Sequence, residues 1–151
     1  MVKKIVLTLF FVTLIGCSGQ VTFGCSCLEV KSDKTAKVDY KKWLKNFDGA
    51  VFIGRVVKIE PIEKRRQSKV TFEVETYWKG VETTEAFVYT ATDGAACGVP
   101  YVEGKKYFVI ANASEGKLQT DLCSWLGYSK DEKAYLKGLG KGKSPDKGGR
   151  I

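Results

Sequence analysis

Four cysteines that follow an N-terminal export signal constrain the fold of this chain more than any other feature. The chain has 151 residues and five cysteines, and Cys25, Cys27, Cys97 and Cys123 lie beyond the segment that we interpret as the signal. An even number of cysteines in an exported chain favours disulfides over free thiols. We therefore expect a small domain that is stapled by two bridges.

The first 16 residues have the pattern of a signal peptide. Lys3 and Lys4 precede an uncharged and mostly apolar run from Ile5 to Ile15. This run is about half as long as the roughly 20 residues that a membrane-spanning helix needs, so we interpret it as a signal and not as a permanent anchor. No later stretch reaches the required length, which predicts that the remainder is soluble.

The end of the signal has two interpretations. Leu14-Ile15-Gly16-Cys17 resembles a bacterial lipobox, which is cut before Cys17 and leaves a lipid on that cysteine, with residues 17–24 as a linker. Alternatively, an ordinary signal peptidase cuts after Gly24 and leaves Cys25 as the first residue. The first interpretation, which we favour, predicts a lipid-anchored protein of the cell envelope, and the second predicts a secreted protein.

The cysteines can pair in three ways, and geometry excludes one of them. A bridge between Cys25 and Cys27 is too tight for ordinary disulfide geometry. In both remaining pairings the Cys25-Ser26-Cys27 segment is pinned to two distant segments, at Cys97 and at Cys123. Each bridge closes a long loop and contributes about 4 kcal/mol in the chain-entropy model, although the two do not add fully. The spacing lacks the Cys-x-x-Cys pairs of four-thiolate zinc sites and of redox motifs.

Short strands account for most of the remaining chain. Residues 69–78 alternate strictly, with Val70, Phe72 and Val74 on one face and Glu73 and Glu75 on the face that we expect to be solvated. Further strands are predicted over 50–60, 86–91, 107–111 and 117–122, with a bend or bulge at Gly54. Residues 61–68 are interpreted as a charged loop. Helical spacing and a capping box predict short helices over 39–47 and 129–139.

Five short strands between two short helices predict an all-β domain. We expect a five-stranded closed or partly closed barrel of the OB-fold type over residues 25–140. A β-sandwich would need about seven strands, which the chain does not supply. Residues 141–151 are rich in Gly and Lys, which predicts a flexible basic tail.

The composition disfavours catalysis and nucleic-acid binding. The chain has no His, which removes His-based acid–base chemistry, nucleophile activation and metal ligation. Because Glu73 and Glu75 are expected in solvent, we predict no enzymatic activity, no cofactor and no metal site. The net charge of +8 is interpreted as a solvated Lys-rich surface. Tyr77, Phe87 and Tyr89 on strands suggest oligonucleotide binding as an alternative, which export disfavours.

Several short motifs follow one another in a characteristic order. They are Cys25-Ser26-Cys27, Ala50–Val57, Val70–Val74 with Trp78-Lys79-Gly80, Ala96-Cys97-Gly98 with Gly104–Tyr107, and Leu122-Cys123. This order resembles the N-terminal, netrin-like (NTR) domain of tissue inhibitors of metalloproteinases (TIMP), in particular its bacterial members, over roughly Cys25 to Tyr135. The resemblance implies an OB-fold barrel with bridges Cys25–Cys97 and Cys27–Cys123.

The resemblance also implies a mechanism. In that family the mature chain begins at the first Cys of the Cys-x-Cys motif, and its α-amine and carbonyl oxygen chelate the catalytic zinc of a metalloendopeptidase. Here Cys25 would chelate, Ser26 would enter the pocket beside the zinc, and Cys27 would pin the strand. Ala95 and Ala96 would flank this segment. The implied partner is a zinc metalloendopeptidase, and we expect the protein to be a monomer.

The two interpretations of the signal lead to different functions. If Cys17 is the lipidated first residue, the nitrogen of Cys25 is an amide and cannot chelate zinc. The protein would then be an envelope-anchored module whose barrel binds another protein or a glycan.

Overall fold

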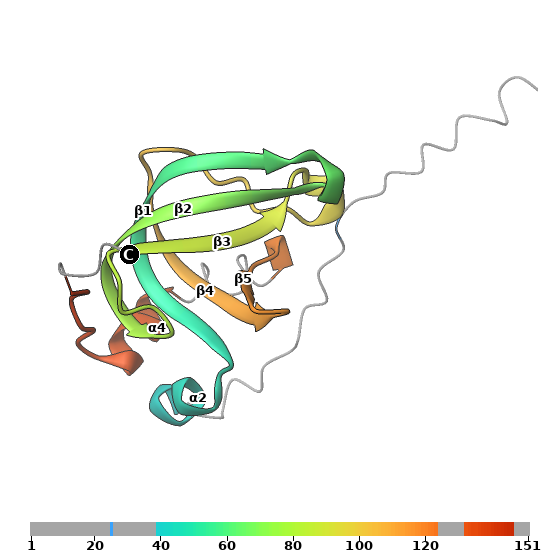
Figure 1. Cartoon of the computed structure of the whole chain (residues 1–151). Helices are drawn as coiled ribbons and strands as arrows, with labels where there is room; N and C mark the ends of the chain where they lie inside the picture. Colours follow the sequence, from blue (N-terminus) through green and yellow to red (C-terminus); the bar gives the residue numbers. More distant parts are fainter. Residues whose placement is uncertain (1–24, 26–38, 124–131, 147–151) are drawn as a thin grey trace, which may run out of the picture.

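The centre of the molecule is a closed barrel of five strands (Figure 1). The computed structural model describes residue 25, residues 39–123 and residues 132–146. The strands are β1 (Gly49–Ile62), β2 (Gln67–Lys79), β3 (Glu85–Ala91), β4 (Lys106–Ser114) and β5 (Lys117–Gln119). Around the barrel they follow the order β1-β2-β3-β5-β4, and only the β3–β5 pair is parallel. The predicted five-stranded, mostly β architecture is confirmed.

Alternation along the strands places one set of apolar side chains inside the barrel. Phe52 and Phe72 are fully buried there and meet edge to face with their ring centroids 5.5 Å apart. The pairing of β1 with β2 shifts between Ile53 and Gly54, as the sequence predicted for this glycine. A Cβ at Gly54 would lie 2.9 Å from the carbonyl oxygen of Glu73, so only glycine lets the two strands approach this closely.

The predicted charged loop over residues 61–68 is wrong. The β1 strand continues to Ile62 and β2 begins at Gln67 as its partner, so only the turn η1 (Glu63–Arg65) and Arg66 connect them. None of residues 61–68 is fully buried, so this hairpin arm needs no apolar alternation, and the sequence does not mark it as a strand. The β5 strand is shorter than predicted, because the N–H of Leu122 bonds instead to the carbonyl of Cys97.

Two short helices cover the outside of the barrel near one end. They are α2 (Tyr40–Asn46), capped by the Asp39 side chain, and α4 (Glu132–Leu139). Their aromatic side chains pack together and against the sheet: the Tyr135 ring lies 5.4 Å from Trp43 and 6.2 Å from Phe108. Both predicted helices are confirmed over these residues, while residues 129–131 lie outside the described part of the chain.

Two residues of the Trp78-Lys79-Gly80 motif attach both helices to the barrel, and we call Trp78 and Lys79 the helix clamp. The Trp78 indole N–H donates to the carbonyl of Gly140 at 2.9 Å, just after α4. The Lys79 ammonium donates to three carbonyls at the end of α2, those of Leu44 and Lys45 at 3.0 Å and that of Phe47. A cation is favourable there because the last carbonyls of a helix have no partner within it.

The residues after α4 continue along the barrel before the described chain ends. Lys143 exchanges two backbone hydrogen bonds of 2.8 Å with Tyr77, and the N–H of Asp146 donates to the carbonyl of Glu82. The first residues of the predicted flexible tail, which starts at residue 141, are therefore hydrogen-bonded to the barrel. Main-chain pairing does not depend on side-chain type, so the Gly- and Lys-rich composition did not reveal it. Residues 147–151, and the predicted signal and linker over residues 1–24, lie outside the described residues.

No helix among the described residues is both long enough and apolar enough to cross a membrane.

Candidate functional site

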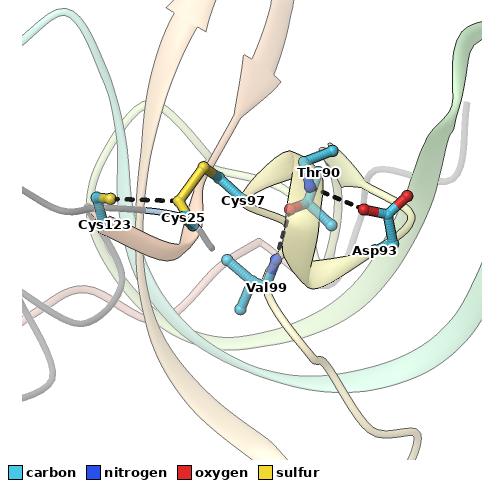
Figure 2. The surroundings of a disulfide bond; sticks show 7 residues. Cys25, Thr90, Asp93, Cys97, Val99 and Cys123 are labelled. Atoms are coloured by element: carbon cyan, nitrogen blue, oxygen red, sulfur yellow. Dashed lines mark hydrogen bonds between the residues drawn. A yellow bond between two sulfur atoms is a disulfide. The ribbon is translucent and has the colours of Figure 1, made fainter. Parts of the chain in front are cut away.

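A disulfide joins Cys25 to the loop that follows β3 (Figure 2). Cys25 and Cys97 are 72 positions apart in the sequence, and their Cα atoms lie 5.3 Å apart. The sulfur of Cys123 lies 3.6 Å from the sulfur of Cys25. Because the Cys25 sulfur is already bonded to Cys97, this is a contact between neighbouring sulfurs and not a bridge. The structure therefore gathers three of the four predicted cysteines at one place.

The fourth cysteine and the residue before it lie outside the described residues. Cys123 is not a free thiol. The Cys27–Cys123 bridge and the place of Ser26 nevertheless stay predictions.

The loop that carries Cys97 is built from local hydrogen bonds, and we call Cys25 and residues Asp93–Gly98 the ridge. The short turn η2 (Gly94–Ala96) begins where the Asp93 carboxylate accepts the N–H of Ala96 at 2.7 Å. The N–H of Gly98 closes the loop by donating to the carbonyl of Asp93 at 2.8 Å. Ala95 and Ala96 lie on its exposed side. Small side chains thus form the exposed surface of this loop, and their predicted role beside the Cys25-Ser26-Cys27 segment stays a prediction.

The backbone conformation of the loop explains why glycine follows Cys97 in the Ala96-Cys97-Gly98 motif. Cys97 ends the turn in the left-handed conformation, with φ of 61°, which a residue with a side chain adopts only at a cost. A Cβ on Gly98 would lie 2.2 Å from the carbonyl oxygen of Ala91, so no other residue fits there. The chain can therefore reverse sharply after β3 and present the Cys97 sulfur to Cys25.

Two further hydrogen bonds attach the ridge to the barrel. The N–H of Val99 donates to the hydroxyl of buried Thr90 at 2.9 Å, and the N–H of Leu122 donates to the carbonyl of Cys97 at 2.7 Å. The second bond brings the segment before Cys123 directly against the loop. Hydrogen bonds to buried groups are costly to break because the lost partner is not replaced by water. The ridge is therefore held from β3 and from the chain after β5.

The loop that carries Cys97 also contacts the turn of the β1–β2 hairpin, which the sequence does not indicate. The backbone N–H and the hydroxyl of Thr92 both donate to the carbonyl of Arg66, at 3.1 and 3.3 Å. The Arg66 guanidinium donates to the Asp93 carboxylate at 3.3 Å. We call Glu63–Arg66 the hairpin tip. The run of basic residues was visible in the sequence, but no local signal places it beside Cys97.

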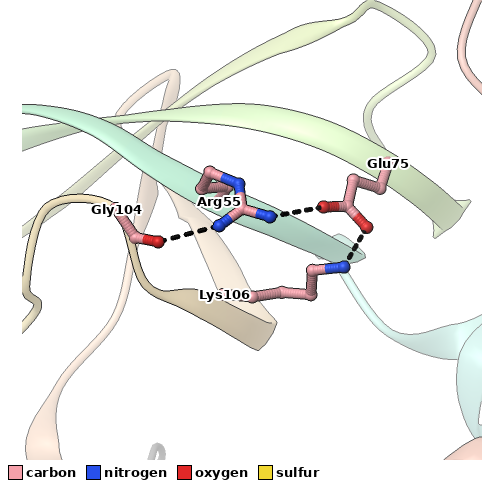
Figure 3. A network of polar contacts seen from close by, with 4 residues as sticks. All are labelled: Arg55, Glu75, Gly104 and Lys106. Carbon is pink, nitrogen blue, oxygen red and sulfur yellow. Dashed lines mark hydrogen bonds and ion pairs between the residues drawn. The ribbon is translucent and has the colours of Figure 1, made fainter.

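The carboxylates of β2 are solvent-exposed, as predicted, and take part in a surface network (Figure 3). Glu75 pairs with Lys106 and, at 3.8 Å, with Arg55, whose guanidinium also donates to the carbonyl of Gly104 at 2.9 Å. All three charged side chains are at least one-third exposed, so water screens these ion pairs and they add little stability. Glu75 is engaged in this network and shares no enclosed site with Glu73.

The three aromatic residues considered for oligonucleotide binding do not share one surface. Tyr77 is only 9% exposed and belongs to the barrel interior. Phe87 is 41% exposed, and the Lys69 ammonium lies 3.9 Å from the centre of its ring. Tyr89 is half-buried, with the Lys117 ammonium 4.9 Å from its ring centre. The structure therefore offers no continuous row of these three rings on which bases could stack.

Within residues 25, 39–123 and 132–146, no group of three or more Cys, Asp or Glu side chains could hold a metal ion. Comparison of the chain with models of known protein families gives no match, and comparison with curated proteins gives none either. Support for a function therefore comes from the geometry of the ridge.

Proposed function

We propose that the protein is an exported inhibitor of zinc metalloendopeptidases, with a barrel of the OB type and with Cys25-Ser26-Cys27 at the centre of its contact surface. One observation carries this proposal: a disulfide holds Cys25 beside an exposed loop of small residues that is itself fixed by hydrogen bonds. Ala95 and Ala96 would flank Cys25-Ser26-Cys27 in the complex with the protease.

The chemistry requires only backbone atoms of Cys25. A neutral α-amine and the carbonyl oxygen of the same residue form a five-membered chelate with zinc and displace the water that a metalloprotease uses for attack. The side chain of Cys25 is occupied by its bond to Cys97, which restrains the backbone that would chelate. A contact surface that is already ordered loses less conformational entropy on binding.

We further propose that the second bridge joins Cys27 to Cys123. The Cys123 sulfur is 3.6 Å from that of Cys25, and a residue two positions further along the chain is at most about 7 Å away between Cα atoms. Peptide mapping of the unreduced protein by mass spectrometry should find Cys25 linked to Cys97 and Cys27 linked to Cys123. A Cys27 recovered as a free thiol would contradict this pairing.

The chelate forms only if the mature protein begins at Cys25. The lipobox at Leu14–Cys17 favours a second function, that of an envelope-anchored module that binds a protein or a glycan without inhibiting a protease. The intact mass of the protein isolated from its source separates the two functions. A first residue at Cys25 supports inhibition, whereas a diacylglyceryl mass on Cys17 supports the anchored module.

The direct test compares two oxidised recombinant proteins that differ by one residue, Cys25–Ile151 and Gly24–Ile151. We expect the first to inhibit zinc endopeptidases, measured with thermolysin-type and metzincin catalytic domains. The second should be weaker by at least about 100-fold, a loss of about 2.8 kcal/mol, because its Cys25 nitrogen is an amide. Neither should inhibit a serine protease. Equal inhibition by both would exclude chelation, and inhibition by neither would overturn the proposal.

A further inference from the structure

We infer that a hollow beside the first half of β3 binds an extended peptide segment of another protein, which pairs with β3 as an added parallel strand. The bound segment carries a basic residue and, two positions later, an apolar residue. This inference goes beyond protease inhibition and does not depend on it, because the open part of β3 is its beginning, whereas the ridge follows its end.

The hollow lies between the β2–β3 connection and the β4–β5 turn. Its volume is about 420 Å³, which is within the range of ligand-binding pockets. Glu85, Phe87 and Tyr89 of β3 line it from one side, and residues 80–83 and 116–118 line it from the others. The hollow therefore follows the edge of a strand.

Only one side of β3 is paired along the whole strand. The β2 strand pairs with all seven residues of β3, whereas β5 pairs with it only at Val88 and Tyr89. Among the described residues, no strand pairs with Glu85–Phe87 on this second side. An unpaired strand edge is a template for pairing with another chain. We call Glu85–Phe87 the open edge.

Main-chain groups of the open edge are directed toward the hollow. The carbonyl of Tyr89 accepts from the N–H of Thr120, just after β5, at 2.9 Å. Because the main-chain groups of alternate residues of a strand face the same side, those of Glu85 and Phe87 also face the side of β5. The carbonyl of Glu85 accepts from the Thr83 hydroxyl at 2.7 Å. The N–H groups of Glu85 and Phe87 are therefore the donors that a bound chain would meet.

The contacts that flank the open edge set the direction of the bound segment. The β5 strand is parallel to β3 where it pairs with Val88, beyond the open edge. An isolated bridge between Thr83 and Asp146, before the open edge, is parallel as well. A segment between these two contacts continues the same arrangement when it also runs parallel to β3.

Side chains of the open edge determine which segment fits. Glu85 and Phe87 are exposed on one face of the strand, while Ala86 is buried on the other. Glu85 lies directly opposite the exposed Glu73 of β2, and the ion pairs of the described residues do not include it. Like charges that face each other across a sheet are unfavourable, whereas opposite charges and pairs of apolar and aromatic residues are favourable. A basic residue therefore fits beside Glu85, and an apolar residue fits beside Phe87.

The experiment measures the binding of capped synthetic pentapeptides to oxidised, ¹⁵N-labelled Cys25–Ile151 by NMR titration. The first probe is Ac-Thr-Lys-Thr-Val-Thr-NH2. The second has Glu in place of Lys, and the third has Lys and Val exchanged, so that only an antiparallel segment would place Lys beside Glu85. The variant Glu85→Lys reverses the charge of the open edge, and Glu63→Lys reverses an exposed charge outside the hollow as the matched control. Thermal unfolding confirms that both variants fold.

The first peptide should shift the amide signals of Glu85 and Phe87 and should bind about fivefold more tightly than either of the other two. Glu85→Lys should reverse the preference between the Lys and Glu peptides, and Glu63→Lys should keep it. Equal binding of the three peptides, or shifts that spare β3, would overturn this inference. Protease inhibition should be the same in all three proteins, so a failure of peptide binding leaves the proposed function intact.

Two other occupants of the hollow would also overturn the inference. Binding of the first peptide only to a protein that ends at Asp146 would assign the hollow to residues 147–151 of the chain itself. Binding of chitotetraose with shifts at Phe87 and Tyr89, without binding of any peptide, would assign it to a glycan.

Discussion

The ridge and the helix-covered end of the barrel hold their outer segments by different physical means. At the helix-covered end, Val51, Phe108, Ile110 and Leu139 are buried beneath an outer shell of aromatic side chains. At the ridge, the exposed residues of the turn are small, and a disulfide together with hydrogen bonds to the side chain and the carbonyl of Asp93 fixes their position. One region is held by apolar burial, and the other by covalent and polar restraint.

This difference determines which of the two regions leaves its residues exposed for contact with a partner. Apolar burial stabilises a segment only by removing its side chains from solvent, so the residues that hold α2 and α4 are unavailable to a partner. A disulfide restrains the chain without covering its surface. The ridge can therefore be rigid and exposed at once, which is what a contact surface requires. The motif Trp78-Lys79-Gly80, which contributed to the resemblance, lies in the helix-covered region and therefore gives information on the fold and not on binding.

Removal of the covalent restraint should have the largest effect. Replacing both Cys25 and Cys97 by Ala opens a loop that spans 72 positions and should lower the free energy of unfolding by about 4 kcal/mol. Inhibition should be lost as well, because Cys25 is no longer held beside the loop. Denaturant unfolding and the protease assay measure the two effects. A variant within about 1 kcal/mol of the unmodified protein would show that polar contacts alone hold the ridge.

Loss of the helix clamp should reduce stability without altering the contact surface. Lys79→Met keeps the aliphatic stem but leaves three carbonyls at the end of α2 without their cation, which should cost about 2 kcal/mol. Denaturant unfolding measures this cost, and Lys105→Met, at an exposed position outside both helices, is the matched control. Inhibition by the folded Lys79→Met protein should be unchanged. A parallel loss of inhibition would show that the two regions are coupled.

A smaller effect is expected when the polar restraint of the ridge is weakened. Asp93→Ala removes the acceptor for the N–H of Ala96 and the partner of Arg66, and should cost about 1 kcal/mol. Asp93→Asn keeps the acceptor and should recover most of that stability. Hydrogen exchange at the Ala96 amide reports the change locally: exchange should be faster in the Ala variant than in the Asn variant. Equal exchange in both would show that the Asp93 side chain does not hold the turn.

The smallest effect at neutral pH is expected inside the barrel. The Tyr101 hydroxyl is buried without a hydrogen-bond partner in the described structure, and burial raises the pKa of this phenol well above its ordinary value. The nearby Thr120 side chain opposes that rise in part. Tyr101→Phe should therefore change stability by less than about 1 kcal/mol near pH 7.

At alkaline pH the same substitution should matter more. The pKa of Tyr101 is higher in the folded than in the unfolded protein, because the folded state keeps the phenol neutral. The free energy of unfolding is therefore unaffected below about pH 10, the ordinary pKa of tyrosine, and falls as the pH rises from there toward the folded pKa. Tyr101→Phe should consequently lose less stability than the unmodified protein between pH 8 and pH 11, measured by denaturant unfolding. Parallel losses in both proteins would indicate that Tyr101 does not titrate with unfolding.

Local patterns in the sequence predicted most of the elements and the inward face of the middle of β2, although Tyr77, expected on the face of Glu73 and Glu75, is buried. Alternation over 69–78 predicted β2 and its interior residues Phe72 and Val74, because side chains on a strand alternate between core and solvent. The number and spacing of the cysteines limited the possible disulfide pairings, and the resemblance implied the Cys25–Cys97 bridge that the structure contains. These properties depend on residues that are close in the chain or on cysteine chemistry.

Tertiary structure alone decided which distant segments meet. The hairpin arm and the pairing of Lys143 with Tyr77 are main-chain contacts, and backbone groups are the same for almost every residue type, so the sequence does not mark them. The bond of Arg66 to the ridge likewise depends on how far β1 and β2 extend past the barrel. Periodicity reports which face of an element is buried, whereas the neighbours of its ends follow from the packing of the whole chain.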